Sequence, residues 1–150
     1  MNFADFARQI QPFSVFESQL VWPFYPSPQH AQRQLTDWVR AGKLLQLRRG
    51  LYALTSPYAA ERPARYLVAN RLVQPSYVSL QAGLAYYGMI PEHVVTITSV
   101  TTGRPQKLTN AFGRFWYRHV KTDFFFGFQN RPVTKTQHAY MATPEKALLE

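Results

Sequence analysis

The stretch from Pro28 to Leu54, "PQHAQRQLTDWVRAGKLLQLRRGLYAL", constrains the fold of this chain more than any other segment. Its first half repeats apolar residues at the spacing of one helical face, and Gly42 ends that pattern. Its second half places short apolar runs on both sides of Arg48–Gly50, which predicts a tight two-stranded hairpin. We therefore expect a helix over 28–41 that is followed at once by a hairpin.

The residues before this stretch predict two further helices. Residues 3–10 place four apolar side chains on one helical face. The sequence "SVFE" (14–17) fits a capping box, which predicts a short helix over 14–21. The prolines of "WPFYP" (22–26) end that helix, and Ser27 suits the N-cap of the next one. This order is that of a winged helix-turn-helix: a helix, a short helix, a polar-faced helix and then a hairpin that forms the wing.

The outward side of the helix over 28–41 is polar and basic, because Ala31, Leu35 and Trp38 define the opposite, core-facing stripe. In a helix-turn-helix, the second helix enters the major groove and its N-terminal side chains reach base edges. Arginine pairs with guanine there and glutamine with adenine. We therefore predict DNA contacts from seven residues of the helix and the wing: Gln29, His30, Arg33, Arg40, Lys43, Arg48 and Arg49.

The charge of the chain supports a polyanionic partner. Lys and Arg number 17 against 8 Asp and Glu, which gives a net charge of +9. Residues 27–50 hold five of these cations and one acid, and residues 44–54 hold no acid at all. Such an excess attracts nucleic acid, so the two wing arginines are expected to lie along phosphates. The alternative is a protein-interaction module whose basic face is merely solvated.

The rest of the chain predicts a second domain. A proline-containing linker follows residue 56, and the apolar period then changes from helical to alternating. We expect an α+β protein, with a winged helix-turn-helix over 1–56 followed by a smaller mixed α/β domain with a mainly antiparallel sheet over 57–150. The elements expected in this domain are helices at 62–72 and 79–88, strands at 94–100, 114–120, 124–128 and 138–142, and a final helix from Pro144. That helix stops in its second turn, so we expect the chain to be a fragment of a longer protein.

Two segments of this second domain are further candidates for binding. The loop "TTGRPQKL" (101–108) presents Arg104 and Lys107 to a phosphate or an acidic partner, although a polar turn is the commoner explanation. The aromatic tract "FGRFWYRHVKTDFFFGF" (112–128) interleaves Arg118 and Lys121 with rings that can stack on unpaired bases. Alternating aromatic residues in strands mostly build cores, and that alternative is favoured here.

Several classes of function find no support in the residues. The chain has no cysteine, which excludes disulfides and thiolate zinc sites, and its four histidines lack metal-ligand spacing. Residues 93–150 contain three scattered acids, so no carboxylate cluster for a metal-dependent nuclease can be placed. Neither Ser99 nor His119 belongs to a nucleophile motif. We expect no enzyme, no cofactor and no metal. Without a signal peptide or membrane span, we expect a cytoplasmic protein.

Five motifs occur in order along residues 34–150: "QLTDWVRAGKLLQLRRGLYAL", "NRLVQPSYVSLQAGLAYYGMIPE", "ITSVTTGRP", "FWYRHVKTDFFFGF" and "ATPEKALLE". Together they resemble the antitoxins of AbiE-type abortive-infection systems, which are also described as predicted transcriptional regulators. This sequence departs from the family pattern in one respect, because members of the family continue past the helix that begins at Pro144.

The resemblance implies a winged helix with recognition helix Pro28–Ala41 and wing tip Arg48–Gly50, and a separate C-terminal domain. It implies a repressor that binds inverted repeats in double-stranded promoter DNA, where an oligomer can form. It also implies the antitoxin of a type IV toxin–antitoxin pair, whose C-terminal part counters a nucleotidyltransferase-like toxin without a stable complex. Some relatives are solitary regulators, and the sequence leaves this alternative open.

Overall fold

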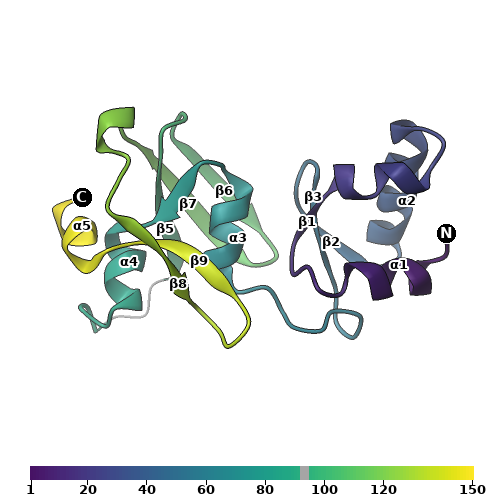
Figure 1. The fold of residues 1–150 in the computed structure, drawn as a ribbon, viewed down its shortest axis with the longest axis horizontal. Helices are drawn as coiled ribbons and strands as arrows, with labels where there is room; N and C mark the ends of the chain where they lie inside the picture. The colour runs from purple at the N-terminus through teal and green to yellow at the C-terminus, as the bar shows by residue number, and fades with distance from the viewer. Residues whose placement is uncertain (92–94) are drawn as a thin grey trace. The chain divides into compact units, whose positions relative to one another are not determined.

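A computed structural model describes residues 1–91 and 95–150, which form two compact units, Met1–Pro63 and Ala64–Glu150 (Figure 1). The chain is mixed α+β. The division lies seven residues later than the expected boundary, because the segment after residue 56 folds back on the first unit. There the Tyr58 ring packs edge-on against Phe3, with ring centroids 4.9 Å apart.

The first unit combines helices with one small sheet. The sheet has the strand order β1-β3-β2, and both pairings are antiparallel. Its elements are α1 (Phe3–Ile10), β1 (Phe16–Glu17), the 3₁₀ turns η1 (Ser18–Leu20) and η2 (Trp22–Phe24), α2 (Pro28–Arg40), β2 (Leu44–Arg48) and β3 (Leu51–Leu54). One apolar core joins α1, α2 and the sheet, and its buried members include Phe6, Phe16, Leu35, Trp38 and Tyr52.

The helix and the hairpin between Pro28 and Leu54 lie where the sequence placed them. Ala41 follows the last residue of α2 as its C-cap, and Gly42 has a φ of +77°, which a side chain would disfavour. Gly50 has a φ of +81° and closes the hairpin. Both glycines therefore serve the backbone conformations that the sequence pattern required.

The helix predicted over 14–21 is wrong. Phe16 and Glu17 instead form β1, which pairs with Tyr52 and Leu51 of β3. The Phe16 ring is fully buried between Phe6 and Tyr52, with ring centroids 5.5 and 5.9 Å away. The amide of Ser18 continues this pairing by donating to the carbonyl of Gly50 at 2.9 Å. Burial of one aromatic ring and pairing with a distant strand thus outweigh a local capping pattern.

The second unit is the longer of the two, whereas we expected a smaller domain. Its described strands form one mixed sheet of order β6-β7-β5-β4-β9-β8, in which β5–β7 and β4–β9 are parallel and the other pairings antiparallel. Its elements are α3 (Arg65–Leu72), β4 (Ser76–Val78), α4 (Leu80–Tyr86), β5 (Thr96–Thr101), β6 (Gln106–Asn110), β7 (Gly113–His119), the 3₁₀ turn η3 (Thr122–Phe124), β8 (Phe128–Pro132), β9 (His138–Ala142) and α5 (Pro144–Leu149).

Several predictions for this unit need correction. The predicted strand over 94–100 begins at Val94, which lies outside the described residues, and β5 continues to Thr101. The strand predicted over 124–128 is wrong, because η3 ends at Phe124 and Gly127 takes a φ of +78° before β8 begins. The loop expected over 101–108 ends earlier than predicted, because Gln106–Asn110 form β6.

Opposite faces of the sheet are covered by different helices. The hydroxyl of Tyr117 on β7 donates to the carbonyl of Ala69 on α3 at 2.5 Å, so Tyr117 lies on the α3 face. The hydroxyl of Thr98 on β5 donates to Ser79 at 2.7 Å and accepts from the amide of Ala82 at the start of α4. Thr98 is in register with Trp116, the residue before Tyr117 on β7, so these two side chains share a face. Successive residues of a strand face opposite ways, so Tyr117 and Thr98 face opposite sides, and α3 and α4 lie on opposite faces of the sheet.

Asn70 of α3 replaces a missing strand partner between β4 and β9. These two strands share a single register pair, Val78 with Met141. The buried amide of Asn70 accepts from the backbone N–H of Tyr140 at 2.6 Å and donates to its carbonyl at 3.3 Å. The side chain therefore satisfies two backbone groups that the short β4 does not reach.

The end of α5 is fixed by the carboxylate of Glu150, whose side chain is 10% exposed. Glu150 accepts hydrogen bonds from the hydroxyls of Tyr77 at 2.6 Å and Ser79 at 2.5 Å. Burial, and then the neighbouring Glu150, raise the pKa of the Tyr77 phenol well above its usual value of 10. The phenol thus remains a neutral donor and joins β4 to the last helix. Among the described residues, no helix is long and apolar enough to cross a bilayer.

Asn70→Ala should destabilise the second unit by about 1–3 kcal/mol, because it leaves both backbone groups of Tyr140 without their partner. Amide hydrogen exchange at Tyr140 should become faster, and urea denaturation should show an earlier transition for this unit. Gln74→Ala, at an exposed position two residues after α3, is the control and should change neither measurement. Unchanged exchange at Tyr140 in Asn70→Ala would show that the amide does not support this strand.

Candidate nucleic-acid interface

The first turn of α2 is the best-defined part of the candidate interface. The hydroxyl of Ser27 accepts the backbone N–H of His30 at 3.2 Å, and Pro28 occupies the first helical position. Burial of Leu35 and Trp38 fixes the rotation of the helix about its axis. The cap and the core together hold the outward side of α2 in one orientation.

All four residues predicted on α2, Gln29, His30, Arg33 and Arg40, are exposed. The Nδ1 atom of His30 lies 2.8 Å from the hydroxyl of Ser27, so the imidazole is held at the start of the helix. Gln29 and Arg33 lie one helical turn apart and share a face. The structure therefore brings an amide, an imidazole and a guanidinium together at the N-terminal end of α2.

The two wing arginines differ in their surroundings. Arg48 is half-buried, and its Nη1 donates to the carbonyl of Arg49 at 2.8 Å, so its guanidinium folds back over the turn. Arg49 is exposed at the tip of the hairpin. The ammonium of Lys43 lies over the ring of Phe3, 5.0 Å from the centroid, and so contacts α1. Of these three cations, Arg49 is the best placed for a phosphate.

Gln32 is a residue that the sequence analysis did not select. It is exposed on α2, and its Nε2 donates to the hydroxyl of Tyr52 at 3.1 Å, which links the helix to β3. The helical spacing from Gln29 to Gln32 would have placed it beside the selected face. Just before α2, burial raises the pKa of the Tyr25 phenol, so this side chain adds no negative charge near the basic residues.

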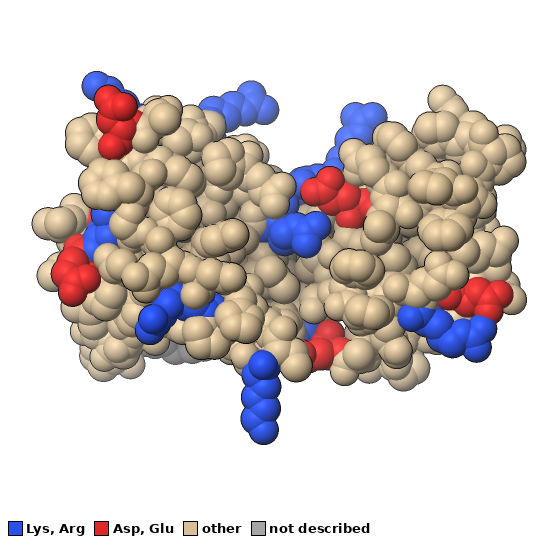
Figure 2. Space-filling model, in the orientation of Figure 1, with Lys and Arg blue, Asp and Glu red and all other residues tan. Residues whose placement is uncertain are grey.

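Basic side chains occur in both units. On the side shown in Figure 2, lysines and arginines lie apart from one another within each unit, with acidic groups near some of them. In the first unit, for example, Arg8 pairs with Asp5 on α1. The candidate interface is therefore defined by the type and arrangement of its side chains, since net charge alone does not locate it.

In the second unit, the structure separates the four predicted contact residues. Arg104, Lys107, Arg118 and Lys121 are all exposed. Lys107 and Arg118 line the same cavity of about 420 Å³ beside Trp116, whereas Arg104 and Lys121 do not line it. The loop around Arg104 is held by His119, whose Nδ1 lies 2.8 Å from the carbonyl of Gly103.

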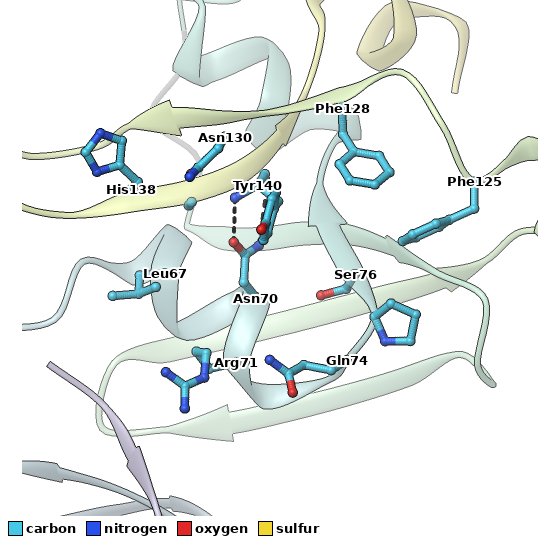
Figure 3. A pocket seen from close by; sticks show the side chains of 12 residues that line it. Leu67, Asn70, Arg71, Gln74, Ser76, Phe125, Phe128, Asn130, His138 and Tyr140 are labelled. Carbon is cyan, nitrogen blue, oxygen red and sulfur yellow. Dashed lines mark hydrogen bonds between the residues drawn. The ribbon is translucent and has the colours of Figure 1, made fainter. Parts of the chain in front are cut away.

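A second cavity of about 600 Å³ lies between α3, β8 and β9 (Figure 3). Figure 3 shows Asn70 bonded to Tyr140 in its middle, with Arg71 on one side and His138 on the other. Phe128 contributes to its apolar wall, and none of the lining side chains is a carboxylate. No sequence pattern indicates this cavity, because its walls come from two distant segments, 67–76 and 125–140.

No cluster of three or more metal-ligating His, Asp or Glu side chains is found within residues 1–91 and 95–150. Models of known protein families give no match to this chain, and curated proteins give none either.

Ser27→Ala should lower the stability of the first unit by about 1 kcal/mol, because the N–H of His30 loses its cap. Thermal denaturation followed by circular dichroism measures the loss. Ser27→Asp keeps a capping oxygen and should stay close to the original stability. Equal melting of all three proteins would mean that this hydroxyl does not determine the start of α2.

Proposed function

We propose that the protein is a sequence-specific DNA-binding transcriptional repressor whose first unit is a winged helix-turn-helix. The observation that carries this proposal is the group Gln29, His30 and Arg33, exposed at the capped end of a helix that a basic hairpin follows. The sheet order β1-β3-β2 and the helices on it are compatible with this fold. The turns η1 and η2 occupy the place where the proposed fold has its middle helix.

In the proposed complex, α2 lies in the major groove with its first turn against the base edges. Arg33 then pairs with guanine and Gln29 with adenine, the partners that their donor and acceptor groups match. Arg49 lies against phosphates beside the groove, where its charge replaces condensed counterions. Base contacts provide sequence preference, and phosphate contacts provide affinity that falls as salt is added.

Arg33→Ala should relax base preference at one position of the operator, with a loss of about 1–3 kcal/mol for the preferred base. The measurement is fluorescence anisotropy of labelled promoter DNA against variants of a single base pair. Arg8→Ala removes the same charge from α1 and serves as the matched control. If the two variants discriminate bases equally well, Arg33 makes no base contact.

Arg49→Ala should instead weaken binding to all DNA sequences alike. Removing one phosphate contact should reduce the slope of log affinity against log salt by about 0.9. Titrations of promoter and scrambled DNA at two salt concentrations measure both effects. Equal affinity of the unchanged protein for promoter and scrambled DNA would contradict a sequence-specific repressor.

We further propose that the protein is the cytoplasmic antitoxin of an AbiE-type pair and acts against a nucleotidyltransferase-like toxin. The ordered motifs over residues 34–150 support this part of the proposal. Co-expression with such a toxin encoded beside it should restore growth of the host. Promoter repression without any rescue of growth would identify a solitary regulator instead.

A further inference from the structure

We propose that the α4-side face of β6 and β7 in the second unit binds a single strand of nucleic acid through Trp116, Lys107 and Arg118. This surface is separate from α2 and the hairpin, and its proposed ligand differs from duplex DNA. The inference does not depend on the proposed repressor function.

The alternation along β7 places one aromatic ring outside the core. Phe115 and Tyr117 are buried, with 0% and 3% of their surfaces exposed, whereas Trp116 between them is 43% exposed. Trp116 is in register with Thr98, which bonds to the start of α4, so the indole lies on the α4 face. The aromatic residues of β7 thus divide into two core rings and one ring that is available to a ligand.

Basic side chains surround this ring on the same face. Lys107 pairs in register with Trp116, and its Nζ lies 4.4 Å from the centroid of a ring of the indole. Arg114 and Arg118 flank Trp116 two residues before and after it, so both share its face. An aromatic ring and three cations therefore occupy adjacent positions on two paired strands.

The charge of this surface fits a polyanion. Residues 95–122 contain five lysines and arginines and no Asp or Glu. A cavity of about 420 Å³ adjoins Trp116, and Thr98 and Gln81 line it together with Lys107 and Arg118. A base stacked on the indole would have polar groups at its edge and cations near its phosphate.

The shape favours an unpaired strand over a duplex. The faces of bases in a duplex are stacked on one another, so an indole lying on a sheet cannot stack on them without unpairing. In single-stranded nucleic acid the bases are free to stack on aromatic side chains while cations contact the backbone. The exposed ring is therefore the feature that selects the ligand.

The test is a titration of the full chain with short fluorescein-labelled oligouridine and oligothymidine, which form little structure of their own. Trp116→Ala should weaken binding by about tenfold or more, with an unchanged salt slope, because a stacking contact releases no counterion. Arg118→Ala should weaken binding and reduce the slope by about 0.7. A preference between the two strands shows whether RNA or DNA is the better ligand.

Two matched controls are available in the same unit. Phe126 is 57% exposed and also carries a lysine, with Nζ of Lys146 4.0 Å from its ring centroid, but that lysine is 3.8 Å from the Glu150 carboxylate. Phe126→Ala should leave binding unchanged, and so should Lys135→Ala, which removes an exposed cation near β9. Circular dichroism establishes that each variant is folded.

The outcomes separate this proposal from the repressor function. The double variant Arg33→Ala/Arg49→Ala should bind oligouridine as the original chain does. Loss of strand binding in that variant would assign it to the first unit and overturn the inference. Equal affinity of that double variant for the strand and for its duplex would also overturn the inference, as would uridine monophosphate binding as tightly as the oligonucleotide.

Discussion

The burial of aromatic rings in two separate cores is the constraint on which the rest of this structure depends. In the first unit, Phe6, Phe16 and Trp38 pack together and fix the rotation of α2. In the second, Phe115 and Tyr117 are buried, so their face of β7 packs against the core. In each unit, the buried face determines which polar side chains point outward. The exposed cations of both units are therefore placed by the rings packed behind them.

The sequence predicted the elements whose information is local. Helix α2 and the hairpin after it have their cap, their apolar period and both glycines within one short segment, from Ser27 to Leu54. The strand at 138–142 was also placed correctly. The same local rules failed at Phe16, because its strand partner lies in β3, far along the chain. They failed at β6 as well, because its polar residues form a strand only against β7.

The candidate site follows the same division. Exposure of Gln29, His30 and Arg33 could be predicted from helical spacing, because Gln29 and Arg33 lie opposite the apolar stripe and His30 lies at the flank of that side. The contact of Lys43 with Phe3 could not be predicted in this way, since the two residues lie 40 positions apart in the sequence. The separation of Trp116 from its aromatic neighbours required the strand register and the identity of the helix on each face. Spacing alone left every ring of that tract a candidate for the core.

Two surfaces with different geometries on one chain lead to different rules of recognition. A helix presents side chains along a ridge, which suits a groove whose edges carry the sequence information. A sheet presents a flat surface, where an exposed ring such as Trp116 interacts with the face of any base. In the functions proposed, the first arrangement would discriminate among sequences, and the second would discriminate paired from unpaired strands. A chain with both would recognise the sequence of a duplex with one unit and strand pairing with the other, and each surface can be disabled without changing the core that supports it.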